Sequence, residues 1–227
     1  MFPQPRQEVL NAPPLTVPKE LEGFVKLNLN ENPFGPSPKV VEKLRALVRN
    51  VSRYPSPDPQ ELHQRIADYV GVDPENVVVT AGGDEAIDLL FKVFVNPGDE
   101  VVITTPTFDV YEARASLYGG VPKFAPRGAG FEILSKRVAE QISPKTKAVF
   151  VCSPNNPTGN ATPLSVLREL AELSPLLVVD EAYVEFADGS CTSLLDEFDN
   201  IVVLRTFSKA FGLAGLRIGY AVACEQV

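Results

Sequence analysis

Histidine, cysteine and tryptophan are scarce in this sequence, and their scarcity removes several classes of active site. The chain has 227 residues, no tryptophan and a single histidine, His63, within the charged stretch Glu61–Arg65. A Ser-His-Asp triad or a histidine-rich metal site would have to be built on that one residue, so we expect His63 at the surface and no metal site. The three cysteines, Cys152, Cys191 and Cys224, are far apart and form no C-x-x-C motif, which favours buried, reduced thiols.

Clustered positive charge and long apolar runs are also missing. The net charge is −8, with no Lys/Arg cluster, which argues against nucleic acid and anionic membranes as partners. No stretch approaches the roughly eighteen apolar residues of a membrane span, and the polar, proline-interrupted Met1–Leu10 has no apolar signal-peptide core. Hydrophobic residues make up 44% and charged residues 22%, as in an ordinary soluble globular protein, so we expect a cytoplasmic location.

The beginning of the chain differs from the rest in its pattern. Residues 1–37 are proline-rich and have no sustained period, which predicts an extended N-terminal arm. From Pro38 onward apolar residues recur at helical spacing, and a second helix is predicted over about Gln60–Val70. We therefore expect residues 38–227 to form the main domain.

Short β-branched segments then alternate with helical ones. The predicted strands are Asn76–Thr80, Glu100–Thr104, Lys147–Cys152, Leu176–Asp180 and Ile201–Arg205. The predicted helices between them are Gly83–Phe94, Phe108–Tyr118, Ser135–Ile142 and Pro163–Leu173. This alternation predicts an α/β fold in which helices cover both faces of an open, mostly parallel sheet.

Polar and glycine-bearing residues follow the carboxyl ends of these strands. In open parallel sheets, ligands bind outside this edge. The residues at the five ends are Gly82-Gly83-Asp84, Pro106-Thr107-Phe108, Asn155-Asn156, Asp180 and Ser208-Lys209. The pattern predicts one site assembled from five strand ends.

The glycine turn before the first of these helices suits an anion. Gly82 and Gly83 let the backbone turn sharply into a helix whose first N–H groups can bind negative charge. The alternative is an ordinary turn in which Asp84 only caps the helix. The segment is not G-x-G-x-x-G, so a dinucleotide fingerprint is not supported.

Lys209 carries the most specific chemistry in the chain. It follows Thr206 and Ser208 at a strand end, where a lysine removed from water can lose its proton and condense with an aldehyde. Thr206, Ser208 and Arg217 together suit a phosphate, which the arginine can bind with two hydrogen bonds. Taken alone, Lys209 could be a solvated surface lysine, and Asp180 could simply cap a loop.

Seven motifs occur in an order that resembles a known family. They are Leu27-Asn28-Leu29-Asn30-Glu31-Asn32-Pro33, Arg53-Tyr54-Pro55, Gly83-Asp84-Glu85, Pro106-Thr107-Phe108-Asp109-Val110-Tyr111, Ser153–Gly159, Asp180-Glu181-Ala182-Tyr183, and Thr206-Phe207-Ser208-Lys209 with Arg217. Over nearly the whole chain they resemble the fold-type I pyridoxal 5'-phosphate (PLP) enzymes, and within these the histidinol-phosphate aminotransferases. The resemblance implies PLP as the cofactor and a PLP-binding large domain.

The resemblance also implies roles around the cofactor ring. Lys209 would hold PLP covalently and then move the proton between the substrate α-carbon and the cofactor. Asp180 would pair with the pyridinium N–H and so keep the ring an electron acceptor. Asn156 and Tyr183 would hydrogen-bond the phenolic oxygen, and Phe108 would stack on the ring.

The other matched residues are implied to hold the phosphate and the substrate. The phosphate ligands would be Gly83, Asp84, Thr206, Ser208 and Arg217. Tyr54 is implied to reach the phosphate of the neighbouring subunit, which means a homodimer with shared active sites. Asn30 and Asn32 are implied to contact substrate, although both could be turn residues before Pro33.

The chain departs from the family pattern at three points. Phe108 stands where many relatives have tyrosine, and residues 1–37 contain no tyrosine, which relatives commonly place near the substrate. The sequence ends just after the strand expected to carry Arg217, and no later arginine is present. In the family a further stretch completes the large domain and forms a C-terminal small domain with a carboxylate-binding arginine. We therefore expect a fragment of a longer enzyme that is inactive by itself.

The leading functional prediction is amino transfer between histidinol phosphate and 2-oxoglutarate, in histidine biosynthesis. The partners would be a small-molecule amino donor and a 2-oxo acid acceptor. An aromatic or aspartate-type aminotransferase and a decarboxylase of a phosphorylated amino acid are alternatives, because all need the same electron sink. A non-catalytic regulator on this fold is a further alternative, but it would not need Lys209, Asp180 and Tyr183 together.

Overall fold

Seven strands form one sheet at the centre of the fold. The computed structural model describes residues 2–11, 22–56 and 59–227. The strand order is β1-β7-β6-β5-β4-β2-β3, and among the described strands β7 alone runs in the opposite direction to the rest. The strands are β1 (Val77–Thr80), β2 (Glu100–Thr105), β3 (Val121–Pro126), β4 (Thr146–Cys152), β5 (Leu177–Asp180), β6 (Ile201–Thr206) and β7 (Gly219–Ala223). The predicted mostly parallel α/β sheet is confirmed.

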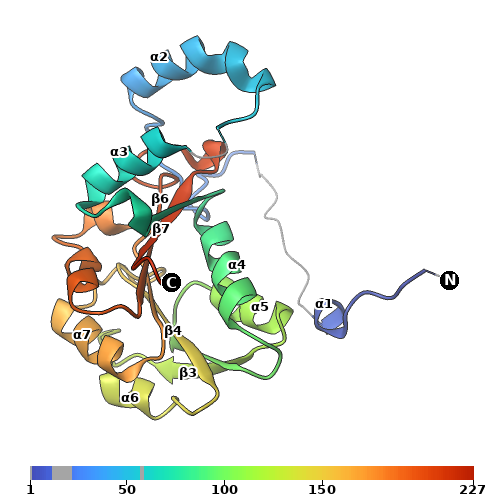
Figure 1. The fold of residues 1–227 in the computed structure, drawn as a ribbon, viewed down its shortest axis with the longest axis vertical. Helices are drawn as coiled ribbons and strands as arrows, with labels where there is room; N and C mark the ends of the chain where they lie inside the picture. The colour runs from blue at the N-terminus through green and yellow to red at the C-terminus, as the bar shows by residue number, and fades with distance from the viewer. Residues whose placement is uncertain (1, 12–21, 57–58) are drawn as a thin grey trace.

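Helices cover both faces of this sheet (Figure 1). One face carries α3 (Gln60–Val70), α6 (Ser135–Ala139) and α7 (Leu164–Leu173), and the other carries α4 (Gly83–Phe94) and α5 (Val110–Leu117). Successive side chains of a strand point to opposite faces, so β5 contributes to both hydrophobic cores. Strands buried on both faces are continuous apolar runs, which is why their β-branched segments could be recognised in the sequence.

One strand, β3, was not predicted, and another, β7, was predicted with the wrong start. β3 contains Pro122 and Pro126 and lies at the sheet edge, where a strand tolerates proline. β7 is short, and Arg217 precedes it with a left-handed φ of 52°, so the prediction that a strand carries Arg217 is wrong. Short 3-10 helices link the other elements: η2 (Pro74–Asn76), η3 (Val184–Phe186), η4 (Cys191–Asp196) and η5 (Ala214–Leu216).

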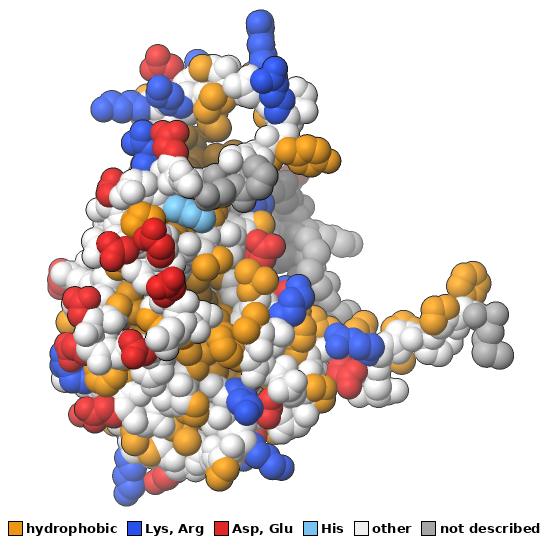
Figure 2. All heavy atoms as spheres, in the orientation of Figure 1, with side chains coloured by type: hydrophobic (Ala, Val, Ile, Leu, Met, Phe, Trp, Pro, Cys, Tyr) orange, Lys and Arg blue, Asp and Glu red, His pale blue; other side chains and the backbone are white. Residues whose placement is uncertain are grey.

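The N-terminal residues lie outside the sheet layers. The predicted arm is not wholly extended, because it contains α1 (Gln7–Asn11), which lies beside α5, where Arg6 donates a hydrogen bond to the Leu117 carbonyl at 3.2 Å. α2 (Pro38–Leu47) and η1 (Val48–Ser52) contain no buried residue and stand away from the sheet (Figure 1). Lys and Arg side chains gather on these two elements with apolar side chains between them (Figure 2), a grouping that was not predicted from the sequence.

The scarce residues lie mostly as predicted. His63 is partly exposed on α3 (Figure 2). All three cysteines are free thiols; Cys152 and Cys191 are buried, whereas Cys224 is partly exposed, contrary to the prediction. Within the described ranges, no helix combines the length and the apolar character needed to cross a membrane.

Candidate active site

A cavity of about 520 Å³ lies at the carboxyl ends of the parallel strands. Its walls come from residues that follow β1, β2, β4, β5 and β6, and from the N-terminal arm, which is the edge at which a site was predicted. The predicted site residues in its lining are Asn30, Gly83, Asp84, Phe108, Asn156, Asp180, Tyr183, Thr206, Ser208, Lys209 and Arg217. The fold thus brings eleven predicted residues to one cavity.

Lys209 lies in the loop after β6 and faces the arm. Its Nζ donates a hydrogen bond to the Leu29 carbonyl at 2.7 Å and lies 5.9 Å from the centroid of the Tyr183 ring. Burial lowers the pKa of the Lys209 ammonium group, and the carboxylates of Asp84 and Glu31 oppose this shift. A lowered pKa increases the fraction of neutral amine, which is the nucleophilic form.

Asp180 ends β5 with a buried carboxylate that is 7% exposed. Its Oδ2 accepts a hydrogen bond from the Tyr111 hydroxyl at 2.6 Å, and its Oδ1 accepts one from the Ala182 N–H at 3.0 Å. Burial raises the pKa of the Asp180 carboxyl, and these two hydrogen bonds oppose the shift. The site therefore holds a negative charge in a fixed orientation at a free-energy cost.

The turn between β1 and α4 forms an anion cradle with Arg217. Gly82 has a φ of 85°, and a Cβ atom on it would lie 2.4 Å from the Arg217 guanidinium. That guanidinium also lies 3.5 Å from the Asp84 carboxylate. The hydroxyls of Thr206 and Ser208, 2.9 Å apart, line the same cavity. A helix N-terminus, a guanidinium and two hydroxyls suit a phosphate group.

The N-terminal arm closes one side of the cavity. The Asn30 side chain, at a residue with a left-handed φ of 50°, donates a hydrogen bond to the Tyr183 hydroxyl at 2.9 Å. Burial raises the pKa of Tyr183, and the contact with Asn30 opposes this shift. In the segment after β2, the Phe108 ring packs edge-on against the Tyr111 ring, with centroids 5.7 Å apart.

Comparison with known proteins identifies the family. The sequence model of aminotransferase class I and II matches residues 22–227. The chain belongs to the class I and II aminotransferases. The match covers the arm that closes the cavity and every strand of the sheet.

Individual relatives of this aminotransferase chain share its sequence over most of its length. The histidinol-phosphate aminotransferase of Methanosarcina mazei is 45% identical over 206 residues, which are 90% of this chain and 56% of the relative. That of Methanocaldococcus jannaschii is 42% identical over 91% of this chain and 57% of its own length. The chain therefore spans a little over half the length of the curated relatives it matches.

Solved structures share the fold of this aminotransferase chain. The histidinol-phosphate aminotransferase of Sinorhizobium meliloti in complex with pyridoxal 5'-phosphate has a TM-score of 0.79 and 28% identity, covering 87% of this chain and 55% of that one. The aspartate aminotransferase of Thermus thermophilus with maleate has a TM-score of 0.81 and 31% identity, covering 87% and 56%.

Two predicted site residues of the aminotransferase chain lie outside the cavity lining. The Asn32 side chain donates a hydrogen bond to the Ala210 carbonyl at 3.0 Å and accepts one from the Phe34 N–H at 2.9 Å, so it fixes the arm to the loop after Lys209. Tyr54 is fully exposed. Its predicted contact is with a second subunit, so this chain alone does not test it.

Sequence reasoning missed two residues that support the site. Tyr111 was noticed only as part of a motif, and its place three residues after Phe108, on the first turn of α5, was the available signal. Arg127 is 6% exposed and donates hydrogen bonds to the Cys152 carbonyl at 3.2 Å and to Asn155 at 3.0 Å. No local sequence pattern marks Arg127, because its partners come from other strands.

Proposed function

We propose that this chain forms the cofactor-binding part of a PLP-dependent aminotransferase that transfers the amino group between histidinol phosphate and 2-oxoglutarate. The observation that carries the proposal is one cavity lined by Lys209, Asp180 and the anion cradle at Arg217. We further propose residues 38–227 as the PLP-binding large domain and residues 1–37 as its arm.

The residues present fit PLP in chemistry and placement. The cradle offers α4 N–H groups, two hydroxyls and a guanidinium to a phosphate, with Gly82 leaving room for the guanidinium beside the turn. Asp180 presents a carboxylate that suits a ring N–H, and Phe108 presents an aromatic side chain to a ring. When bound, PLP supplies an electron sink for the electrons left on the substrate α-carbon.

Lys209 and Asp180 divide the proton chemistry. Lys209, whose pKa is lowered by burial, would hold the cofactor through its aldehyde carbon with loss of one water, and its free Nζ would accept the proton from the donor α-carbon. Asp180 would present negative charge to the ring nitrogen, and Tyr111 fixes the direction of that carboxylate. Asn156 and Tyr183 line the same wall and are proposed to hydrogen-bond the phenolic oxygen.

The substrate assignment rests on the relatives and on the arm. Histidinol-phosphate aminotransferases share 42–45% identity with most of this chain, and Asn30 lies at the cavity wall where a donor would enter. An aspartate-type aminotransferase is the second candidate, because the Thermus thermophilus aspartate aminotransferase is 31% identical with a TM-score of 0.81. A screen of amino donors against 2-oxoglutarate separates the two: turnover with aspartate and none with histidinol phosphate would contradict the first assignment.

We propose that a second copy of the chain covers α2 and η1. These elements bury no residue, and they and the following loop expose Leu47, Val51 and Tyr54, the last two at 82% and 100%. Exposed apolar clusters of this kind mark interfaces. Tyr54 would then reach the cofactor phosphate of the partner. Light scattering should give the mass of a dimer for the wild type and the mass of a monomer for Val51→Glu. Val93→Glu, at an exposed valine of α4, is the control and should remain a dimer.

We also propose a cytoplasmic location. The three cysteines are free, and two of them are buried, which suits a reducing compartment.

The cofactor assignment is tested by borohydride reduction. Protein incubated with PLP is reduced with borohydride and digested, and the masses of its peptides are measured by mass spectrometry. A pyridoxyl adduct on Lys209 is expected. An adduct on a different lysine, or none, overturns the proposal.

A further inference from the structure

A buried ion pair lies beside the cavity at the ends of two neighbouring parallel strands. Arg205 of β6 donates hydrogen bonds to Glu181, which follows β5, with Nε and Nη2 at 3.0 and 2.9 Å from Oε2. The two side chains are only 7% and 3% exposed. Glu181 is the sequence neighbour of Asp180 and Arg205 that of Thr206, and Arg205 itself reaches the cavity lining, so the pair adjoins two proposed cofactor ligands.

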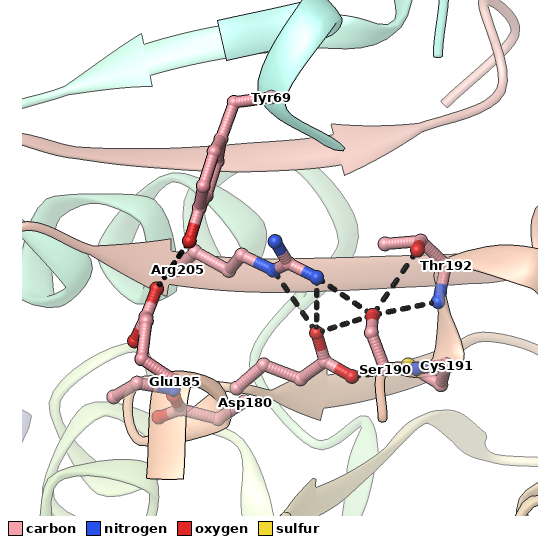
Figure 3. A network of polar contacts seen from close by, with 9 residues as sticks. Tyr69, Asp180, Glu185, Ser190, Cys191, Thr192 and Arg205 are labelled. Carbon is pink, nitrogen blue, oxygen red and sulfur yellow. Dashed lines mark hydrogen bonds and ion pairs between the residues drawn. The ribbon is translucent and has the colours of Figure 1, made fainter. Parts of the chain in front are cut away.

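The same pair closes the segment that carries Tyr183. Glu181 Oε1 accepts a hydrogen bond from the Cys191 N–H at 2.7 Å, and Oε2 accepts one from the Ser190 hydroxyl at 2.8 Å. Arg205 Nη2 lies 2.6 Å from the same hydroxyl (Figure 3). One carboxylate thus ties together the start and the end of segment 181–191 and binds both to β6.

Sheet stability alone does not explain this arrangement. β5 and β6 are already paired through Leu177–Asp180 and Ile201–Leu204, and a buried ion pair often stabilises a fold no better than apolar side chains of similar size. The hydrogen bonds of Glu181 are instead directed at the backbone and the hydroxyl that end the Tyr183 segment. Such contacts restrict where that segment can lie relative to the strand end at Asp180.

We propose that Glu181 and Arg205 are positioning residues for cofactor binding, which hold Tyr183 and Asp180 in a fixed relation at the cavity wall. This inference rests on the proposed PLP site. Neither residue is assigned a step in the reaction: they act through Tyr183 and Asp180, as outer ligands orient the residues that touch a bound group.

The test compares matched variants of PLP-loaded protein. Glu181→Gln keeps the size of the side chain and an oxygen for the Cys191 N–H but removes the charge. The double variant Glu181→Gln/Arg205→Gln leaves no unpaired buried charge, so it is the variant expected to fold if the single one does not. Arg168→Gln breaks an exposed ion pair with Glu197, 2.7 Å long and remote from the cavity, and serves as control.

The readouts are the PLP dissociation constant and the pH midpoint of the visible absorption band, both measured on folded protein. We expect PLP affinity to fall on the order of 10-fold or more in the Glu181 variants, as for other residues that orient ligands. The pH midpoint should shift, because Tyr183 is proposed to hydrogen-bond the phenolic oxygen of the chromophore. Arg205→Lys, which keeps a positive charge beside Glu181, should lose less PLP affinity than the double variant.

Each failure has its own signature. If wild-type protein forms no adduct at Lys209, the proposed function fails. If wild type binds PLP and the folded Glu181 variants keep its affinity and pH midpoint while only their melting temperature falls, the pair is structural and the positioning role is refuted.

Discussion

Replacing Asp180 with asparagine should stabilise the cofactor-free protein while it disables the site. The wild-type carboxylate is buried, and burial raises its pKa, so ionisation at neutral pH opposes folding. Asparagine removes the charge and keeps both hydrogen bonds: its Oδ1 can accept from the Ala182 N–H, and its Nδ2 can donate to the Tyr111 hydroxyl, which now lie 3.0 and 2.6 Å from the carboxylate oxygens. No cavity is created, and the Tyr111 O–H, which loses Asp180 as its acceptor, can donate to the sulfur of Cys152, its other hydrogen-bond partner.

The magnitude follows from the loss of one buried charge without the loss of a hydrogen bond. Point substitutions change stability by roughly 0.5–3 kcal/mol, and because the hydrogen-bond positions of Asp180 stay filled we expect a gain at the low end, on the order of 1 kcal/mol at pH 7. For a chain of this size that gain raises the melting temperature by roughly 2–4 °C. In the PLP-loaded protein the same change should weaken the electron sink. The activation free energy of α-proton removal should then rise by roughly several kcal/mol, and the rate should fall accordingly.

The stability difference between the Asp180→Asn variant and the wild type should depend on pH. Because the folded-state pKa is raised, the penalty is fully present above that pKa and shrinks as pH falls toward about 3.9, the ordinary value for aspartate. The difference in melting temperature between variant and wild type should therefore be largest near neutral pH and vanish in acid. Asp188→Asn, at an exposed aspartate, is the matched control. A variant that melts at or below the wild-type temperature at pH 7 would refute the reasoning.

Three further predictions concern attachment, the dimer and the extent of the chain. The Lys209→Ala variant should still bind PLP through the anion cradle and Asp180, but the bound amino donor should keep its α-proton. Exchange of solvent deuterium into the donor at the wild-type rate would exclude Lys209 as the base. Tyr54→Phe should weaken PLP binding by roughly 1.5–3 kcal/mol, the range for a hydrogen bond to a charged group, and mixing it with Lys209→Ala should restore some intact sites; an unchanged dissociation constant makes Tyr54 structural. Residues 1–227 alone should not transaminate, whereas a chimera completed with the part of the Methanosarcina mazei relative that this chain does not match should; turnover by 1–227 alone would contradict this.

The central elements could be predicted because they are buried on both sides. β4, β5 and β6 consist almost entirely of buried residues, so their apolar runs are long enough to stand out. β3 was not predicted because an edge strand has few apolar side chains that face the core, and because its two prolines are typical of turns and loops. Arg217 was placed in a strand because the sequence does not reveal its left-handed turn before β7.

The cavity residues could be predicted because strand ends mark them, whereas their supports could not. Lys209 and Asp180 follow strands directly and have chemistry that stands out. Tyr111 and Arg127 act only through partners from other parts of the chain: Tyr111 contacts Asp180, and Arg127 contacts Asn155. Such contacts depend on tertiary packing, which local periodicity does not encode.

The placement of β7 between β1 and β6 has a consequence for the order of assembly. β1 pairs with the sheet only through β7, in which Gly219 lies opposite Thr80 and packs against the Gly82 turn. The anion cradle therefore combines the segment that follows β1 with the segment that precedes β7, which lie far apart in the sequence. During synthesis the strands β2 to β6 can pair as they emerge, but β1 has no neighbour until β7 is available. Contacts of such long range form slowly, so we expect cofactor binding to begin only after β7 has inserted. Until then the exposed edges of β1 and β6 are open to wrong pairing.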